Sequence, residues 1–251
     1  MTIVNRQQAS EVRHGRRIAT HAEDVWGWST LAGRQRAERR AALLLQCSGI
    51  APGQRVLEIG GGTGLFTERL ARCGATLFTI DVSPDLLQRA RRRLQTTAHV
   101  LPVLADVVAL PFPDQSMDAV VGSSILHHLP LPLSLPEIYR VLRPGGAVAF
   151  AEPNMLNPQI MIQKHVPFIK RWMGDTPDET AFVRWPLARA FRAAGFVDMV
   201  VEPYDFLHPW TPDLIVPLVR RLGCVMERLP LFKEIAGSLI IGGRRPAMPG
   251  A

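Results

Sequence analysis

The sequence carries a run of glycines between an apolar run and a helical pattern, in the stretch 56–64 that reads VLEIGGGTG. Glycine lacks a Cβ atom, so a turn built on Gly60, Gly62 and Gly64 lets the backbone approach a ligand closely. Asp81 ends the next apolar run and adds a carboxylate at the same edge. This arrangement predicts a ligand-binding turn at the carboxyl end of a strand rather than an ordinary tight turn.

The spacing of the glycines argues against a dinucleotide cofactor. The dinucleotide fingerprint G-x-G-x-x-G/A needs a third small residue. Counting from Gly60 places Leu65 at that position, and counting from Gly62 places Thr67 there. Glu58 stands just before the first glycine, and its negative charge disfavours a pyrophosphate but suits a ligand with cationic groups. The turn therefore favours a cationic ligand over a nicotinamide cofactor.

Two adjacent histidines and one glutamate offer acid–base chemistry. His127 and His128 follow the apolar stretch 117–122, and an imidazole with the ordinary pKa of about 6.5 can act as a general base at neutral pH. Adjacent helical residues point about 100° apart, so we expect one histidine at most to face a substrate. Packing beneath a cofactor is the alternative role for either. Glu152 could orient a histidine, hold a substrate hydroxyl or cap the helix that follows it.

The elements that must position these residues alternate along the chain. Short apolar runs predict strands at 55–59, 76–81, 100–105, 117–122, 147–151, 197–203 and 238–243. Amphipathic patterns predict helices at 20–47, 65–73, 85–95, 133–142, 158–173, 186–194 and 211–229. Strands that are apolar on both faces and alternate with helices indicate a parallel sheet covered on both sides.

We therefore expect an α/β fold with a doubly wound, mostly parallel seven-stranded sheet of the Rossmann-like type. Residues 1–49 predict an N-terminal helical cap, and residues 50–153 the ligand-binding core. Residues 154–251 are expected to complete the sheet and to add helical insertions near its C-terminal edge. A length of 251 residues fits a single domain overall.

On these motifs the chain resembles the class I S-adenosylmethionine-dependent methyltransferases, and among them the ubiquinone and menaquinone biosynthesis group. The resemblance covers residues 50–153 closely and the flanks loosely. In the family, the residue matched by Asp81 grips the ribose hydroxyls, and the residue matched by Asp106 hydrogen-bonds the adenine amino group; a solvated turn is the alternative for Asp106. The resemblance implies S-adenosyl-L-methionine as cofactor, bound by Glu58, Gly60, Gly62, Gly64, Asp81, Val82, Asp106, Val107 and Ser123.

The resemblance also implies a reaction. Methyl transfer from a sulfonium is an in-line displacement, so the protein mainly positions the reactants and excludes water. His127, His128 and Glu152 are the candidate catalytic residues, needed where the acceptor must lose a proton. The segment 21–30 resembles the part of related enzymes that covers the methionine end of the cofactor, where Arg34 or Arg36 could pair with the carboxylate.

The acceptor is expected to be a small, largely apolar or aromatic metabolite, such as a quinone, lipid or secondary metabolite, methylated on oxygen, carbon or nitrogen. The insertions at 158–173 and 211–229 are rich in large apolar side chains, more than the cofactor site needs. A nucleic-acid methyltransferase is the alternative, although the end of the fourth strand lacks the Asn/Asp-Pro-Pro-aromatic motif of base-amino methylation. A non-catalytic protein that binds the cofactor is the other.

Charge and cysteine content bear on the surroundings of the protein. The formal charge is +7 from 29 basic and 22 acidic residues, and Lys164, Lys170 and Lys233 are the only lysines. The many arginines are spread along the chain instead of forming one stripe as in a nucleic-acid reader. Three cysteines without ligand spacing predict buried thiols, no metal site and a reducing cytoplasm. The start has no signal-peptide pattern, and a peripheral membrane contact by 207–231 stays a lesser alternative.

Overall fold

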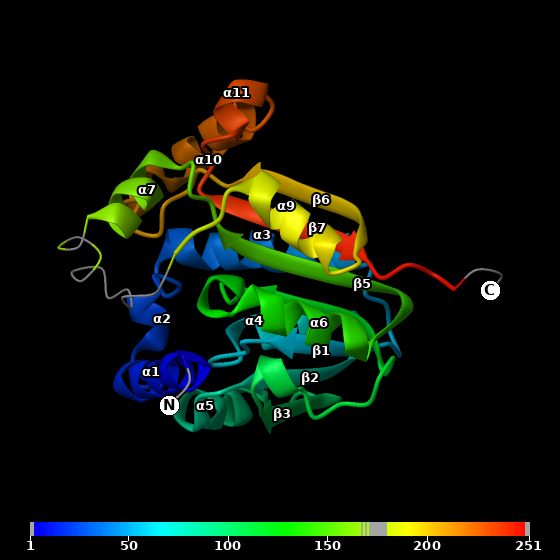
Figure 1. Ribbon diagram of the computed structural model, residues 1–251. Coiled ribbons are helices and arrows are strands. Elements are labelled where there is room, and N and C mark those ends of the chain that lie inside the picture. The colour runs from blue at the N-terminus through cyan, green and yellow to red at the C-terminus, as the bar shows by residue number, and fades with distance from the viewer. Residues whose placement is uncertain (1–2, 167, 169, 171–179, 249–251) are drawn as a thin grey trace.

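The computed structural model describes residues 3–166, 168, 170 and 180–248 (Figure 1). Within them lies a sheet of seven strands: β1 (Arg55–Ile59), β2 (Thr76–Asp81), β3 (Val100–Leu104), β4 (Met117–Ser123), β5 (Leu142–Pro153), β6 (Val197–Tyr204) and β7 (Ser238–Arg244). Their order is β3-β2-β1-β4-β5-β7-β6. The first five pair in parallel, and β7 runs antiparallel to both β5 and β6. The predicted doubly wound, mostly parallel seven-stranded sheet is confirmed.

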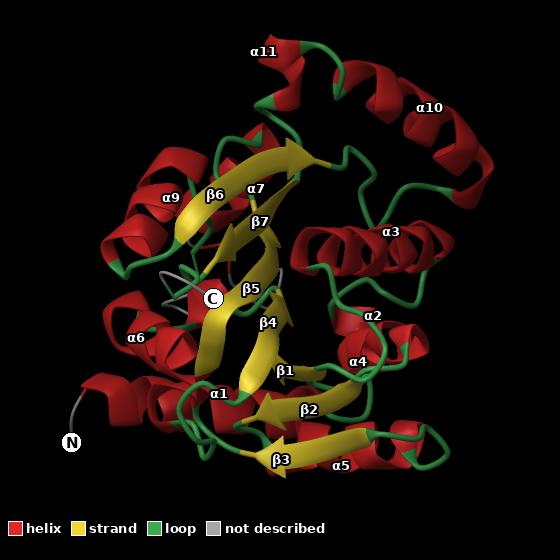
Figure 2. Ribbon diagram, turned by 90° about the vertical axis from the view of Figure 1, so that its right-hand side faces the viewer, coloured by secondary structure: helices red, strands yellow, loops and turns green. Residues whose placement is uncertain are grey.

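Helices cover both faces of this sheet (Figure 2). In the described part of the chain the helices are α1 (Ile3–Ile18), α2 (Ala22–Val25), α3 (Leu31–Ser48), α4 (Leu65–Leu70), α5 (Pro84–Leu94), α6 (Leu131–Val141), α7 (Pro158–His165), α9 (Arg184–Ala193), α10 (Val216–Met226) and α11 (Pro230–Lys233). Helices α3, α4 and α5 lie on one face and α6 and α9 on the other, and α1 contacts both α2 and α5. The carboxyl ends of the parallel strands are thereby left open between the cap and the C-terminal helices.

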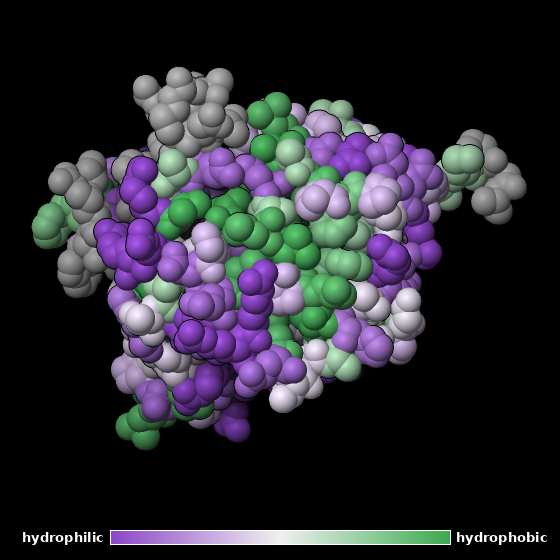
Figure 3. Space-filling view, turned by 90° about the horizontal axis from the view of Figure 1, so that it is seen from below, coloured by the Kyte–Doolittle hydropathy of each residue, from purple (hydrophilic) through white to green (hydrophobic). Residues whose placement is uncertain are grey.

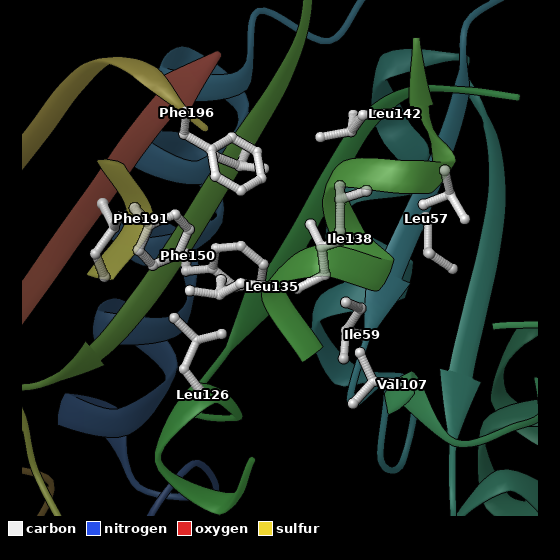
Figure 4. Close-up of a cluster of buried hydrophobic side chains, with 14 of the residues drawn as sticks. Leu57, Ile59, Val107, Leu126, Leu135, Ile138, Leu142, Phe150, Phe191 and Phe196 are labelled. Carbon is white, nitrogen blue, oxygen red and sulfur yellow. The ribbon is translucent and has the colours of Figure 1, made fainter. Parts of the chain in front are cut away.

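Two apolar clusters hold the layers together. Successive side chains of a strand point to opposite faces, so the neighbours Val56 and Leu57 belong to different clusters. Leu57 and Phe150 meet Ile138 of α6 and Phe191 of α9 on one side of the sheet (Figure 4). On the other side Val56 packs with side chains of α3 and α4. Both faces of the central strands are therefore buried, as the continuous apolar runs predicted.

The N-terminal helix predicted at 20–47 is wrong in one respect, because the chain breaks it in two. Helix α2 ends at Val25, and Gly27 takes a left-handed φ of +72°. Thr30 then caps α3 by accepting a hydrogen bond from the Gly33 amide over 2.9 Å. The loop between the two helices turns the chain and brings α2 beside the glycine turn.

The largest further differences from the predicted bounds are in three elements. Strand β5 begins at Leu142, which was predicted as the last residue of the preceding helix, five residues before the predicted start of the strand. A short 3₁₀ turn, Asp213–Ile215, precedes α10 in place of a helix from residue 211. Helix α7 ends at His165, and residues 171–173 of its predicted span lie outside the described residues.

The three cysteines are free thiols. Cys47 and Cys73 are half-buried, and burial raises the pKa of the Cys47 thiol. Cys224 is exposed, so the prediction of a buried thiol is wrong there. The reason is that α10 buries little more than one narrow face, which includes Val216 and Gly223.

Candidate active site

A cavity of about 410 Å³ lies at the carboxyl ends of β1, β2 and β4, within the range of about 300–1,000 Å³ common for small-molecule sites. Nine of the twelve site residues predicted from the sequence line it: Gly60, Gly62, Asp81, Val82, Asp106, Val107, Ser123, His127 and His128. The other three, Glu58, Gly64 and Glu152, are not among the lining residues. The sequence therefore predicted the wall of this cavity better than it predicted the supports behind the wall.

The glycine turn is fixed to the neighbouring strand by its own backbone. The Gly60 amide donates to the carbonyl of Ile80 over 2.9 Å, and the Gly62 amide donates to Asp81 Oδ2 over 2.8 Å. Both glycines have left-handed φ angles, +71° and +55°. A Cβ on Gly60 would lie 2.6 Å from the Ile125 side chain. Only glycine fits there, and the turn presents bare backbone to the cavity.

Two acidic side chains reach the cavity from the ends of neighbouring strands. Asp81 accepts hydrogen bonds from the amides of Ser83 and Gly62, both over 2.8 Å, and burial raises the pKa of Asp81 against these two bonds. Asp106 accepts a hydrogen bond from the Val108 amide over 3.1 Å and caps the 3₁₀ turn Val107–Ala109. A carboxylate oxygen can accept more than one hydrogen bond, so both groups keep acceptor capacity toward the cavity.

Glu58 lies beneath the glycine turn and not in the cavity wall. It is 2% exposed and accepts a hydrogen bond of 2.5 Å from Thr67 of α4. Burial raises the pKa of Glu58 to about 7. Because Glu58 shares its strand face with Val56, its side chain points toward α4 and not along the strand axis. Gly64 takes a φ of +79° and packs closely against α5.

We expect Glu58→Gln to change how stability depends on pH. Below about pH 4.5 both the folded and the unfolded carboxyl are protonated, so burial has no ionic penalty. As the pH rises toward about 7, the unfolded chain loses its proton first and the folded state loses stability. The free energy of unfolding of the natural protein should therefore fall by about 2–3 kcal/mol more than that of Glu58→Gln between about pH 5 and about pH 8.

Urea unfolding at the two pH values measures this difference. Glu68→Gln on α4, where the carboxylate is half-exposed near Arg93, is the matched control and should follow the natural protein. Parallel pH profiles for the natural protein and Glu58→Gln would contradict the assignment.

Glu152 holds His127 from behind the cavity wall. Its Oε1 accepts hydrogen bonds from the amides of Ile125 and Leu126 over 2.9 and 2.8 Å. Its Oε2 lies 2.6 Å from Nδ1 of His127, and the Glu152 side chain is fully buried. Of the three roles open from the sequence, the geometry shows the orientation of a histidine. The helix after β5 has another cap, since Asn157 accepts the bonds at the start of α7.

His128 is held from a different element. Its Nδ1 lies 3.1 Å from Glu11 Oε1 of α1, and its ring centroid lies 4.2 Å from that of His127. Both rings line the cavity, whereas we expected one at most to face a substrate. The partners distinguish the two rings, because Glu152 is buried in the core and Glu11 belongs to the cap.

The N-terminal cap is tied to the glycine turn by charged groups. Thr63 of the turn donates a hydrogen bond to Glu23 of α2 over 2.9 Å. Arg93 of α5 lies 2.7 Å from the same carboxylate and also donates to the Thr63 carbonyl over 3.1 Å. These contacts place Trp26, which lines the cavity, over the glycines. The cap thereby forms part of the cavity wall.

Arg40 is a candidate site residue that the sequence reasoning missed. It is 4% exposed, lines the cavity and donates hydrogen bonds to the hydroxyls of Ser124 over 2.7 Å and Ser238 over 3.0 Å. Within the described part of the chain no carboxylate lies within salt-bridge distance of its guanidinium. The sequence did contain one indication of its burial. Arg40 stands at helical spacing between Ala37 and Leu44, which lie on the buried face of α3.

The two arginines predicted near the cofactor carboxylate differ. Arg36 lines the cavity and pairs with Asp205 over 2.9 Å. Arg34 is not among the lining residues and donates a hydrogen bond to the carbonyl of Ser29. The helix phase explains this, because Arg36 and Arg40 are four residues apart and share one face of α3.

Comparison with known proteins agrees with this architecture. Residues 57–150 match the family model described as a methyltransferase domain. The demethylmenaquinone methyltransferase of Mycobacterium sp. (strain KMS) is 33% identical over 168 residues, which cover 59% of this chain and 70% of that protein. A malonyl-[acyl-carrier protein] O-methyltransferase of Halorhodospira halophila is 34% identical over 157 residues, 61% of this chain. The chain spans about half, 52%, of that relative's length.

Solved structures give the same fold. The crystal structure of the [4+2]-cyclase SpnF superposes with a TM-score of 0.69 and 21% identity, and covers 96% of this chain and 97% of that one. At this identity the likeness shows the fold alone. The relationship rests on the sequence matches, which confirm the resemblance to the menaquinone group. A Haemonchus contortus phosphoethanolamine N-methyltransferase of the same fold, solved in complex with S-adenosyl-L-methionine, has a TM-score of 0.60 and 18% identity and covers 83% of this chain and 52% of that one, in agreement with S-adenosylmethionine as the cofactor. The chain belongs to the class I S-adenosylmethionine-dependent methyltransferases.

Proposed function

We propose that the chain transfers a methyl group from S-adenosylmethionine to a small, largely apolar or aromatic acceptor. The observation that carries the proposal is that one cavity joins the glycine turn and two strand-end carboxylates to the His127–Glu152 pair. The cofactor supplies a methyl group already activated by the positive sulfonium. The residues of the chain then have to position the reactants, exclude water and accept a proton.

The residues present fit the cofactor at its nucleoside end. Asp81 offers two oxygens, each held by a backbone amide, to the vicinal hydroxyls of the ribose. Asp106 offers an acceptor to the adenine amino group, and Val82 and Val107 supply apolar surface for the base. In this arrangement Glu58 has no contact with the cofactor and instead supports the turn through Thr67.

Arg40 fits the carboxylate at the methionine end. Arg36 already has Asp205 as partner, whereas hydroxyl groups supply the hydrogen-bond acceptors of Arg40. A buried guanidinium gains most from an anion, which supplies the counter-charge that hydroxyls lack. We therefore place the cofactor carboxylate at Arg40, four residues beyond Arg36, one of the two arginines expected from the sequence.

His127 fits the role of general base. Hydrogen bonding of Nδ1 to Glu152 keeps the proton on that nitrogen, so the lone pair of the neutral ring is on Nε2. An acceptor hydroxyl gives its proton to Nε2 while its oxygen bonds to the methyl carbon, and the electron pair of the broken carbon–sulfur bond stays on sulfur. Glu152 then stabilises the imidazolium. An acceptor carbon or nitrogen that must lose a proton during methylation also needs a general base at this position.

Apolar side chains favour an apolar acceptor. Ile160 of α7, together with Leu129, Pro209 and Trp210, lines the part of the cavity formed outside the glycine turn. The relatives named for demethylmenaquinone and malonyl-[acyl-carrier protein] point to a quinol or an acyl carboxylate as classes to test first. A cytoplasmic location belongs to the same proposal, supported by the free thiols.

The excess of arginine was the observation that favoured a nucleic-acid acceptor. Many of these arginines instead form ion pairs within the fold. Ion pairs with carboxylates of the described residues engage Arg36, Arg39, Arg69, Arg72, Arg93, Arg140, Arg143 and Arg184. These ion pairs join neighbouring helices, strands and loops of the fold. They do not form the aromatic-interleaved stripe expected of a nucleic-acid reader.

Incubation with methyl-labelled S-adenosylmethionine and a panel of acceptors tests the proposal. We expect label in organic-extractable quinols, phenols or acyl carboxylates, and none in RNA. Asp81→Asn, which weakens the proposed cofactor site, serves as the negative control. Label in RNA alone would overturn the proposed acceptor class, and cofactor binding without transfer to any acceptor would favour the non-catalytic alternative.

A further inference from the structure

Helix α10 is apolar on two faces. One face packs against the start of α3, where Val216 joins Ala32 and Leu207 in a small cluster. The other face points outward and carries Leu218, Leu222 and Val225, spaced at i, i+4 and i+7 on one side of the helix, and the exposed Leu229 follows just beyond its end. Packing within the chain explains the inner face and leaves the outer one unexplained.

The exposed apolar surface continues on both sides of α10. Leu214 before the helix is 92% exposed and Leu231 in α11 is 86% exposed. We call the whole surface the outer α10–α11 face; its residues are Leu214, Ile215, Leu218, Leu222, Val225, Leu229, Leu231 and Phe232. Both helices lie at the outer end of the molecule, beyond β6 (Figures 1 and 2). A soluble protein rarely exposes such a contiguous patch unless the patch binds something.

Positive charge borders this face. Arg220, Arg221 and Arg228 are exposed, and none of them lies within salt-bridge distance of a carboxylate in the described part of the chain. Of the nearby acids, Glu227 is turned inward and paired with Arg39 over 2.5 Å, and Asp213, directly before Leu214, is exposed. Arg221 precedes Leu222 of α10, and Arg228 precedes Leu229 just beyond the helix. Three exposed arginines against one exposed acid give the border of the outer face a net positive charge.

We propose that the outer α10–α11 face docks on the surface of an anionic lipid bilayer. An interfacial helix places apolar side chains among the lipid chains and its arginines at the phosphate level, which matches this stripe and its border. No helix in the described part of the chain is long and apolar enough to cross a membrane. A symmetric contact between two copies would bring the arginine borders together, which disfavours a dimer through this face.

The position of the face fits the delivery of an apolar acceptor. Pro209 and Trp210 line the cavity and stand a few residues before Leu214 in the chain, and Trp210 is itself half-exposed. Tryptophan side chains are enriched at the interface between lipid and water. Docking would therefore bring this side of the cavity near the bilayer. This step rests on the proposed function, whereas the docking itself does not.

Sedimentation with lipid vesicles tests the docking on the full chain, without cofactor or acceptor. We expect binding to vesicles made of equal parts of phosphatidylcholine and phosphatidylglycerol, weak binding to phosphatidylcholine alone, and weakening by salt. Leu218→Gln combined with Leu222→Gln should lower the partition coefficient more than about tenfold. Arg221→Gln combined with Arg228→Gln should lower it about tenfold on anionic vesicles.

A matched control comes from the opposite edge of the sheet. Leu101 and Leu104 of β3 are about half-exposed. Strand β3 lies at the lower edge of the sheet in Figure 1, and Figure 3 shows the molecule from below, where apolar residues gather in the middle of the view. Leu101→Gln combined with Leu104→Gln should bind vesicles as the natural protein does. Leu214→Gln combined with Leu231→Gln removes the two most exposed side chains and serves where the first pair fails to fold.

Four outcomes would overturn the proposal. They are failure of the natural protein to bind anionic vesicles, unchanged binding of both leucine variants of the outer face, loss of binding in the β3 control, and a dimer that the outer-face variants abolish. Because vesicle binding needs no methyl transfer, failure of the docking leaves the proposed function standing, and the reverse also holds.

Discussion

Replacing His127 with asparagine should lower the rate constant of methyl transfer about 10²- to 10⁴-fold and leave cofactor affinity nearly unchanged. The asparagine amide can still donate a hydrogen bond to Glu152 but has no basic nitrogen. The decrease in the rate constant measures how much proton transfer from the acceptor to Nε2 contributes to catalysis. Single-turnover rates with a labelled cofactor and the acceptor identified by the panel give the comparison directly.

Glu152→Gln tests whether Glu152 positions the histidine. One end of the glutamine can still accept the two amides of Ile125 and Leu126, so its NH₂ group must face His127. A donor at that place favours the tautomer with the proton on Nε2, which then cannot accept another. We expect a loss of rate of about 10²-fold or more. We also expect a changed pH–rate profile, which a merely structural defect would not produce.

Two control variants separate these effects from damage to the fold. His99→Asn alters an exposed histidine before β3 and should leave the rate unchanged. His128→Asn removes the ring held by Glu11 and should have a smaller effect than His127→Asn. A loss in His128→Asn with full activity in His127→Asn would assign the base to His128. Full activity in both variants would indicate an acceptor that is already ionised, such as a carboxylate.

The regular part of the fold was predictable because local pattern and tertiary environment agree. Strands β1 and β2 have the predicted bounds, since each is an apolar run between turn residues and each is buried on both faces. Several cavity-lining residues followed from the predicted strand ends, because a side chain at or just beyond the carboxyl end of a parallel strand lies at the open edge of the sheet. Asp81 and Asp106 are both placed in this way.

The rest of the site depends on contacts between distant segments. Arg40 reaches Ser238 across 198 positions of the chain, and nothing near Arg40 in the sequence marks that pairing. The sequence placed Glu58 beside the first glycine but did not say that its carboxyl turns toward Thr67. The break between α2 and α3 was hidden for a similar reason, since Thr30 also donates to the carbonyl of Pro209 over 2.6 Å.

Substitution of Asp81 should reduce affinity for the cofactor far more than it reduces stability. Two charge-assisted hydrogen bonds to the ribose hydroxyls, each contributing about 1.5–3 kcal/mol, give a loss of about 10²- to 10⁴-fold in Asp81→Asn. The asparagine carbonyl keeps one of the two bonds from the Gly62 and Ser83 amides, so the turn survives better than in Asp81→Ala. Calorimetric titration with S-adenosylhomocysteine measures the loss, and urea unfolding measures stability.

Because the Asp81 carboxyl is buried, the affinity for the cofactor in the same experiment should depend on pH. Burial raises the pKa of this carboxyl, so the free protein binds a proton there more readily than an exposed aspartate does, and affinity for the cofactor should fall as the pH falls. Asp81→Asn cannot titrate and should lose this dependence. Asp85→Asn alters a nearby acid of α5 that does not line the cavity, and it should bind as the natural protein does. Equal losses of affinity and stability in Asp81→Asn would argue against a ribose contact and for a role confined to the glycine turn.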